Sequence, residues 1–413
     1  MSERTMRNSP TPARPDPAAL DRLIDAAVDA GEAPGIAAIV IDREGIVYQH
    51  SAGVRTLGRS EPMSVDTVGW IASMTKAITA AAVMQAVERG LLNLDAPAGD
   101  TLPDIDAIGV LDGFEADGQP RLRPPRRRIT LRDLLTHTSG FSYERWSEDV
   151  WRCHQALDIP PNGTCRLAAL RSPLMFDPGE RWEYGIGVDW AGRVLEAASG
   201  RRLGDWMHDE IFTLLGMTDT AFRISDAMRT RLACMHQRDA DGRIAATPEF
   251  EIPQQPEFEM GGGGLYSTAA DYARFMRMIL NRGELDGQRV LQADTVAAMA
   301  VDQIPSLQVQ ALPSRVPEVS NDAEFFPGLS KGWGLSFMIN RSTAPTGRSA
   351  GSLAWAGLSN CYYWIDLDQG IAGVFVAQLL PFADRKVLPR YLAFETQVYA
   401  SNRAAIRAGS RAI

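Results

Sequence analysis

The stretch SMTKAITAAAVMQAVERG, residues 73–90, carries the strongest structural signal in the chain. It is rich in alanine and apolar on most helical faces, and Gly90 follows as a stop signal. It predicts a helix over residues 74–89 that is buried on nearly all sides. Only three of the 42 basic residues are Lys, and one of them, Lys76, stands at the head of this helix. Because a lysine amine can lose its proton and a guanidinium cannot, a Lys in this place calls for a chemical explanation.

Ser73 and Lys76 form a candidate nucleophile and base. A spacing of three residues puts both side chains on one helix face, and the helix dipole favours an alkoxide at the N-terminus. The alternative is that Ser73 is only an N-cap and Lys76 a surface residue, but the residues after Lys76 are almost entirely apolar. A desolvated amine can accept the serine proton. Tyr184, in PGERWEYG at 178–185, is the best candidate for a relay, because a lysine ammonium stabilises a phenolate.

Working outward from this helix, strand-like runs lie towards both ends of the chain and helical periodicity lies between them. The pattern predicts an α+β fold with one sheet built from both termini and an inserted, mostly helical lobe. We expect a disordered tail at 1–16, a discontinuous sheet domain at 17–95 and 331–413, and a helical domain with loop insertions at 96–330. The expected strands are 35–41, 46–50, 333–339, 360–365 and 371–377, and the further expected helices are 16–30, 130–136, 187–199, 268–281, 293–300 and 388–406.

Composition and charge exclude several classes of protein. With 45% hydrophobic and 23% charged residues the chain is globular. A formal charge of -9 argues against nucleic acid as a partner. No apolar run reaches the roughly 18 to 20 residues of a membrane span or forms a signal peptide, so we expect a cytoplasmic protein with no membrane partner. The four scattered Cys predict free, mostly buried thiols.

Other motifs do not support a site. Gly347-Arg348-Ser349-Ala350-Gly351 is a GxSxG, but a hydrolase triad needs a His later in the chain, and the last His is His236. The run Gly261–Gly264 lacks the Lys-Ser/Thr of a phosphate loop. Asp366 and Asp368 flank a predicted turn, where Asp is favoured, so paired-carboxylate glycosidase chemistry is a weak interpretation. The five His have no metal-ligand spacing. We therefore expect no metal and no cofactor.

Four blocks in the same order resemble the serine β-lactamase and penicillin-binding-protein superfamily, and its class C branch most closely. The first runs from Val68 to Pro103 and contains the Ser-x-x-Lys; the others are ITLRDLLTHTSGF at 129–141, FDPGERWEYG at 176–185 and GGGGLYSTAADYARFMRMILN at 261–281. The resemblance covers about residues 20–395. It implies a class C β-lactamase-like α/β sandwich with an antiparallel sheet flanked by helices.

Two motifs depart from the superfamily. Its second motif is usually Tyr-x-Asn, whereas this chain has Tyr184-Gly185-Ile186; its third is Lys-Thr-Gly or His-Thr-Gly, whereas the matching position here is Trp355-Ala356-Gly357. The missing cation is the natural partner of a penicillin carboxylate. A Trp at the third motif resembles the carboxylesterases on the class C β-lactamase fold, known as family VIII esterases.

This closer resemblance implies a set of site residues. Ser73 would be the nucleophile, with Lys76 and Tyr184 handling its proton. The backbone N–H groups of Ser73 and Leu358 would form the oxyanion hole, at roughly 3 kcal/mol per well-placed donor. Trp355 would form an apolar wall of the active site, with Gly357 of the same motif beside the substrate.

We therefore expect a serine carboxylesterase that cleaves short-chain or small esters through an acyl-enzyme and takes a small-molecule ester as its partner. The alternatives are hydrolysis of β-lactams, D-amino-acid peptides or amides, or acyl transfer, at the same site, and a non-catalytic binding protein. Tyr143 and the loop 248–260 are candidates for lining the pocket. Acidic residues in that loop predict poor tolerance of anionic substrates. The sequence carries no signal of oligomeric state.

Overall fold

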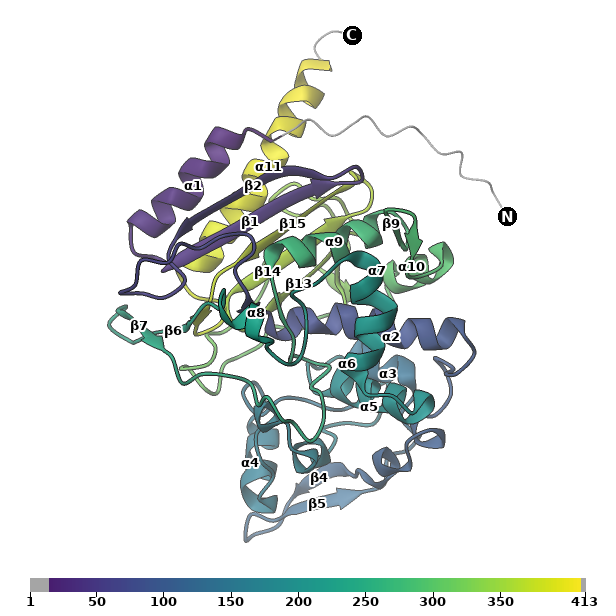
Figure 1. Ribbon diagram of the computed structural model, residues 1–413. Coiled ribbons are helices and arrows are strands. Elements are labelled where there is room, and N and C mark those ends of the chain that lie inside the picture. The colour runs from purple at the N-terminus through teal and green to yellow at the C-terminus, as the bar shows by residue number, and fades with distance from the viewer. Residues whose placement is uncertain (1–14, 410–413) are drawn as a thin grey trace.

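The computed structural model describes residues 15–409 and is organised around a seven-stranded antiparallel sheet (Figure 1). Its strand order is β11-β12-β13-β14-β15-β1-β2. Antiparallel pairing of β1 with β15 places Ala37 opposite Val376 and so joins the N-terminal hairpin to the C-terminal strands. The predicted α+β class, with one sheet built from both termini, is confirmed. The strands are β1 (Gly35–Asp42), β2 (Ile46–Gly53), β11 (Lys331–Trp333), β12 (Met338–Asn340), β13 (Leu353–Gly357), β14 (Cys361–Asp366) and β15 (Ile371–Val376).

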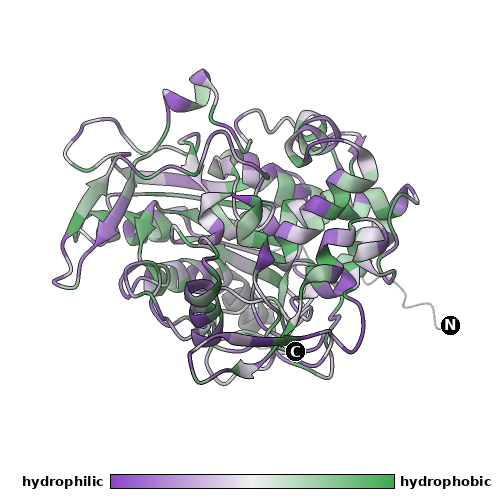
Figure 2. Cartoon of the chain, turned by 90° about the horizontal axis from the view of Figure 1, so that it is seen from below, coloured by the Kyte–Doolittle hydropathy of each residue, from purple (hydrophilic) through white to green (hydrophobic). Residues whose placement is uncertain are grey.

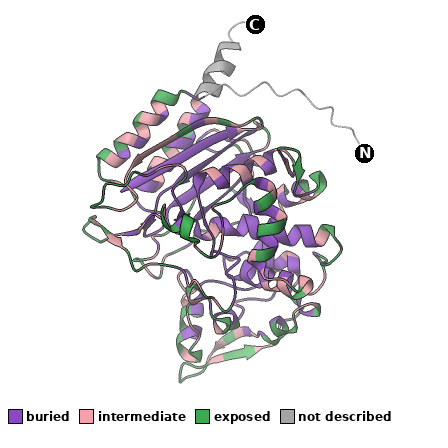
Figure 3. Cartoon of the chain, in the orientation of Figure 1, coloured by how far each residue is buried: buried purple, intermediate pink, exposed green. Residues whose placement is uncertain are grey.

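Helices cover both faces of this sheet (Figure 1). On one face α1 (Pro17–Asp29) packs against α11 (Val387–Gly409) and β2; on the other, α9 (Ala269–Leu280) packs on β1 and β15. Because both faces are covered, the inner strands are mostly apolar, and Gly35–Ile41 of β1 are all buried (Figure 3). The outer helices alternate between hydrophilic and hydrophobic residues (Figure 2), as amphipathic helices do.

The decisive helix is α2 (Thr75–Glu88), and its residues are buried from Thr75 to Ala86. It packs against α5 (Gly187–Ser199) and α6 (Leu203–Met207), so the predicted burial on nearly all sides is confirmed. The other helices and strands are shorter or lie at the periphery: α3 (Leu131–Thr136), α4 (Glu148–Leu157), α7 (Thr213–Leu215), α8 (Asp226–Arg229), α10 (Ala293–Ala300), β3 (Gly69–Trp70), β4 (Val110–Phe114), β5 (Pro120–Arg123), β6 (Met235–Arg238), β7 (Ile244–Thr247), β8 (Tyr266–Ser267), β9 (Glu284–Leu285), β10 (Gln288–Arg289) and β16 (Leu379–Leu380).

The structure corrects one predicted strand. Residues 333–339 are not continuous: β11 ends at Trp333 and β12 begins at Met338, with Ser336 in the left-handed region at φ 67° in the turn between them. The apolar run conceals this turn because its side chains are buried on both strands. Residues 1–14 of the predicted tail lie outside the described residues, and Asp16 already caps α1 by accepting from the N–H of Ala18 at 3.1 Å. The division into two domains stays a prediction.

Candidate active site

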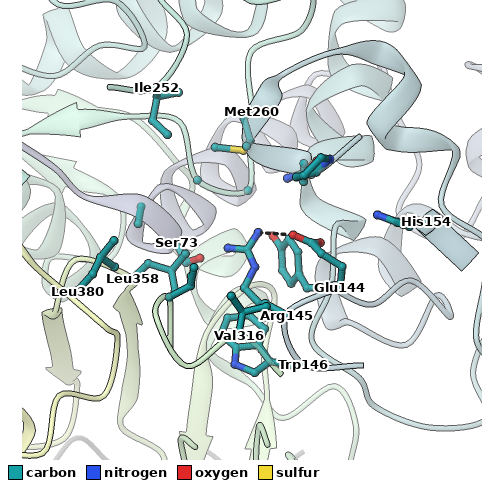
Figure 4. Close-up of a pocket in the computed structure, with 18 of the residues that line it drawn as sticks. Ser73, Glu144, Arg145, Trp146, His154, Ile252, Met260, Val316, Leu358 and Leu380 are labelled. Atoms are coloured by element: carbon teal, nitrogen blue, oxygen red, sulfur yellow. Dashed lines mark hydrogen bonds and ion pairs between the residues drawn. The ribbon is translucent and has the colours of Figure 1, made fainter. Parts of the chain in front are cut away.

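Ser73 lies on a single 3-10 turn, Ala72–Met74, directly before α2. Ala72 adopts φ 46°, a left-handed conformation that is uncommon for any residue other than glycine and is concentrated at functional sites. Ser73 is half-buried and lines a pocket (Figure 4). The strained turn therefore places the serine hydroxyl at the head of a buried helix and in contact with an open cavity.

The pocket has a volume of about 460 Å³ and is walled mainly by apolar and aromatic side chains. Tyr143 and several residues of the predicted loop 248–260 are among them. A largely apolar cavity with a few polar groups is the usual form of a small-molecule site. Its lining includes Ser73, Tyr143, Glu144, Arg145, Trp146, Asn162, Glu251, Gly262 and Leu358.

Lys76 lies directly behind Ser73 and is completely buried. Its Nζ is 3.2 Å from Ser73 Oγ, 3.1 Å from the Tyr143 hydroxyl and 2.6 Å from the Gly262 carbonyl oxygen. Burial lowers the pKa of Lys76 to about 7; the charge of Asp189 opposes the shift, and that of Arg145 adds to it. The amine is therefore neutral in a large fraction of molecules near pH 7, and the surface-residue interpretation is wrong.

Tyr184 completes the predicted group of three. It is buried, and Lys76 Nζ lies 4.7 Å from the centre of its ring. Its hydroxyl accepts a hydrogen bond from Trp355 Nε1 at 2.9 Å. Burial raises the pKa of Tyr184, and hydrogen bonds with Ser73 and Trp355 offset only part of that rise. The phenol is therefore protonated at neutral pH, which suits a proton donor better than a base.

Asp189, which sequence analysis missed, supports Lys76 through a peptide group. Its buried carboxylate, on the first turn of α5, accepts from the Gly262 N–H at 2.8 Å and from Asn162 Nδ2 at 3.2 Å. The carbonyl of that same Gly262 accepts from Lys76. A Cβ at Gly262 would stand 2.7 Å from Asp189 Oδ2, so the position requires glycine. The signal in the sequence was the Gly261–Gly264 run, whose role is close packing.

His137 was missed as well, although it lies within the block at 129–141. It follows α3 with φ 58°, and its Nδ1 accepts from the Gly185 N–H at 3.4 Å. Its ring centre is 4.7 Å from that of Tyr184 and 5.0 Å from that of Trp333. Burial holds the pKa of His137 well below its usual value, so it is neutral. These contacts make it a positioning residue for Tyr184.

The third motif lies at the end of β13. Trp355 and Gly357 lie behind the pocket lining, and Leu358, the next residue, is part of it. Trp355 lies behind Tyr184 and packs on Trp333 at 4.7 Å between ring centres, away from the pocket lining. Gly357 also lies behind the lining; a Cβ there would stand 2.3 Å from the Ile71 carbonyl oxygen, in the segment before Ser73. Leu358 lines the pocket beside Ser73. The backbone N–H groups of Ser73 and Leu358 have no acceptor among residues 15–409.

Ser349, the serine of the GxSxG, is in the loop before β13 and does not line the pocket. Its N–H donates to Asp366 Oδ2 at 2.8 Å, and its hydroxyl accepts from Gln369 Nε2 at 3.1 Å. Within the described part of the chain, no three His, Cys, Asp or Glu side chains are placed to hold a metal ion. In the same range, no helix has both the length and the apolar character needed to cross a membrane.

Comparison with known proteins adds two relatives and one solved structure. The chain is 34% identical over 378 residues to lovastatin esterase from Penicillium rubens, covering 87% of this chain and 92% of the relative. It is 31% identical over 403 residues to monacolin J acid methylbutanoyltransferase from Aspergillus terreus, covering 91% and 93%. The structure of simvastatin synthase (LovD) from Aspergillus terreus matches with a TM-score of 0.81 at 29% identity, covering 93% of this chain and 98% of that chain.

These relatives agree with the resemblance seen in the sequence blocks. The named proteins include an esterase and an acyltransferase, two activities that move an acyl group. The profile of the Beta-lactamase family matches residues 20–397, which is most of the chain. This protein therefore belongs to the Beta-lactamase family and is an enzyme of the serine β-lactamase and penicillin-binding-protein superfamily.

Proposed function

We propose that this enzyme hydrolyses carboxylic esters through a covalent acyl-enzyme on Ser73. The observation that carries the proposal is the distance of 3.2 Å between Ser73 Oγ and Lys76 Nζ, at the edge of a largely apolar pocket. A serine is a weak nucleophile until a neighbouring base takes its proton. Since burial lowers the pKa of Lys76 to about 7, the amine can take that proton at neutral pH.

Lys76 is the base in this proposal, and Tyr184 is the acid. A neutral amine has two N–H donors and one lone pair. The two N–H groups can donate to the Gly262 carbonyl and the Tyr143 hydroxyl, and the lone pair can accept from the Ser73 hydroxyl. Ser73 Oγ attacks the ester carbonyl while its proton passes to Lys76. The alcohol then leaves with the Tyr184 proton, and the Lys76 ammonium reprotonates the phenolate. Water then attacks the acyl-enzyme by the same proton transfers, which releases the acid and restores Ser73.

The two unpaired backbone N–H groups support an oxyanion hole. Ser73 and Leu358 both line the pocket, and their backbone N–H groups have no protein acceptor within residues 15–409. An oxyanion that forms at the ester carbonyl during attack would accept from both. Well-placed donors of this kind are worth about 3 kcal/mol each to the transition state. Tyr143 contributes its hydroxyl to Lys76 and one ring face to the pocket.

Acyl transfer to an alcohol is the second candidate. It is favoured by the relative named as a methylbutanoyltransferase and by a pocket of about 460 Å³, which has room for an acceptor beside a short acyl chain. Hydrolysis of β-lactams is disfavoured because Ile186 and Trp355 occupy the positions of the usual Asn and Lys. Water and alcohol would compete for one acyl-enzyme, so the two activities share every residue named above.

Hydrolysis of p-nitrophenyl butyrate by the wild type, Ser73→Ala and Ser349→Ala tests the proposal. We expect Ser73→Ala to lose activity by at least a thousandfold and Ser349→Ala, the matched serine outside the pocket, to retain it. A chromogenic cephalosporin should turn over slowly or not at all. Adding a primary alcohol and measuring ester product against free acid gives the partition between transfer and hydrolysis. Activity that survives Ser73→Ala would refute the assignment.

A further inference from the structure

Arg145 is a cation in the wall of the Ser73 pocket to which the proposed chemistry gives no task. It is the one Arg or Lys among the described residues that line this pocket. Figure 4 shows its guanidinium extending into the space between Ser73 and Glu144. The side chain is only 15% exposed. Burying most of a guanidinium in a largely apolar pocket is costly unless partners compensate it.

The guanidinium is held in a fixed position. Its centre lies 4.8 Å from the centre of the Tyr143 ring and 5.6 Å from that of the Trp146 ring. The Arg145 carbonyl accepts from the Arg315 N–H at 2.8 Å, which holds the backbone. A planar cation in contact with two aromatic rings has less rotamer freedom left to lose, so a ligand that binds to it incurs a smaller entropy loss.

The partners of Arg145 within the protein are incomplete. Its guanidinium donates one hydrogen bond, from Nη2 to Glu144 Oε1 at 3.2 Å, and no other acceptor for it is found within residues 15–409. The remaining N–H groups of the five are left for a ligand. Arg238, which is also nearly buried, differs: it holds Asp384 with two bonds, at 2.6 and 3.2 Å, and also donates to the Glu32 carbonyl oxygen.

Two acids of the loop 248–260, on which the expected exclusion of anionic substrates rests, have basic partners in the structure. Glu251, the loop acid that lines the pocket, is bound by Arg229 at 2.8 and 3.2 Å. Glu259 accepts from the Gly204 N–H at 2.6 Å and lies 3.4 Å from Arg202. Arg229 and Arg202 offset these two charges, so Glu251 and Glu259 repel an anion in the pocket less than unpaired carboxylates would.

We propose that Arg145 binds a carboxylate of the substrate, so that the preferred substrates are esters carrying a carboxylate within reach of the scissile carbonyl. The inference rests on the proposed function, because it uses the same pocket and nucleophile. A guanidinium presents two parallel N–H donors that match the two oxygens of a carboxylate. Glu144 occupies one donor from the side and leaves the pocket-facing donors open.

The test compares two esters of the same shape that differ in charge, mono-4-nitrophenyl adipate and its carboxamide analogue. The measured quantity is the ratio of their kcat/KM values, in which general damage to the site cancels. We expect the wild type to favour the carboxylate at least tenfold and Arg145→Gln to bring the ratio close to one. Arg152→Gln, an exposed arginine of α4 outside the pocket lining, should keep the wild-type ratio.

A second arm places the carboxylate on the alcohol side, with 4-acetoxybutanoate against 4-acetoxybutanamide and acetate release as the readout. It decides which half of the ester Arg145 contacts. Arg145→Lys keeps the positive charge but lacks the two parallel N–H donors of a guanidinium, so we expect an intermediate ratio. This variant also replaces Arg145→Gln in the test if Arg145→Gln does not fold. Equal ratios in the wild type and in Arg145→Gln, or a wild type without preference in both arms, would overturn the proposal.

Direct binding separates this proposal from the proposed function. Calorimetric titration with adipate needs no turnover, and we expect Arg145→Gln to bind it at least tenfold more weakly than the wild type. If no ester is hydrolysed but adipate binding depends on Arg145, the esterase proposal fails and the carboxylate subsite stands. If both proteins bind adipate equally, or neither binds it, the carboxylate subsite is refuted whatever the esterase assay shows.

Discussion

At the scale of single residues, the burial of Lys76 sets the protonation state on which the site depends. A lysine ammonium cannot accept the Ser73 proton, and burial lowers the pKa of Lys76 to about 7. In the proposed mechanism the amine is charged and inactive below that pH, and it is neutral and active above it. We therefore expect kcat/KM for a neutral ester to rise with pH around a midpoint near 7. Initial rates from pH 5 to 9 would show this; a midpoint near the ordinary lysine value would contradict it.

Trp355 acts on Tyr184 through a single hydrogen bond, and Trp355→Phe removes that bond while keeping an aromatic ring. The Tyr184 hydroxyl loses the indole donor at 2.9 Å, so its orientation towards Ser73 is less restricted. We expect kcat to fall about tenfold, in line with one hydrogen bond, with KM little changed. The matched control is Trp182→Phe, because the buried Trp182 Nε1 has no partner among the described residues. Equal losses in both variants would indicate packing alone.

At the scale of elements, β13 approaches the segment before Ser73 closely, next to the proposed oxyanion donor of Leu358. Gly357→Ala would place a Cβ 2.3 Å from the Ile71 carbonyl oxygen, so the strand must shift and carry the Leu358 N–H with it. We expect kcat to fall about a hundredfold and the free energy of unfolding to fall by about 1–3 kcal/mol.

The control for this element is Gly45→Ala in the turn between β1 and β2. A Cβ at Gly45 meets nothing within 4 Å, so activity and stability should stay near wild-type values. Steady-state kinetics together with urea denaturation measure both quantities. A Gly357→Ala enzyme with wild-type kcat would show that the approach of β13 is not needed for catalysis.

At the scale of the whole molecule, a buried ion pair fastens the C-terminal helix to the sheet. Arg348 precedes β13, and its Nε lies 3.5 Å from Glu395 Oε1 on α11; both side chains are almost fully buried. Arg348→Met would leave the Glu395 charge without its cation. We expect the free energy of unfolding to fall by about 3–5 kcal/mol, with kcat of the folded enzyme unchanged because Arg348 does not line the pocket.

Urea denaturation of Arg348→Met and of the double variant Arg348→Met/Glu395→Leu would check this. Removing both charges takes away the unpaired buried carboxylate, so the double variant should be more stable than Arg348→Met alone. A double variant less stable than the single one would argue that Glu395 is held chiefly by its other partners, such as the Tyr391 hydroxyl at 2.8 Å.

Features that depend on neighbours along the chain could be predicted from the sequence alone. Alanine-rich, apolar composition on most faces predicted α2 and its burial, and the spacing of three residues put Ser73 and Lys76 on one face. The need for a proton relay pointed to Tyr184, and the resemblance of motifs pointed to the end of β13. Sequence reasoning failed at the turn between β11 and β12, because apolar residues are buried on either side of it.

The groups that surround Ser73 and Lys76 come from distant parts of the chain and are brought together by folding. Asp189 reaches Lys76 through Gly262, His137 positions Tyr184, and Arg145 enters the pocket from another segment. These contacts join residues far apart in the chain, so no local pattern encodes them. The same folding removes Lys76 from water and lowers its pKa, a property of the whole surrounding core that no stretch of sequence carries alone.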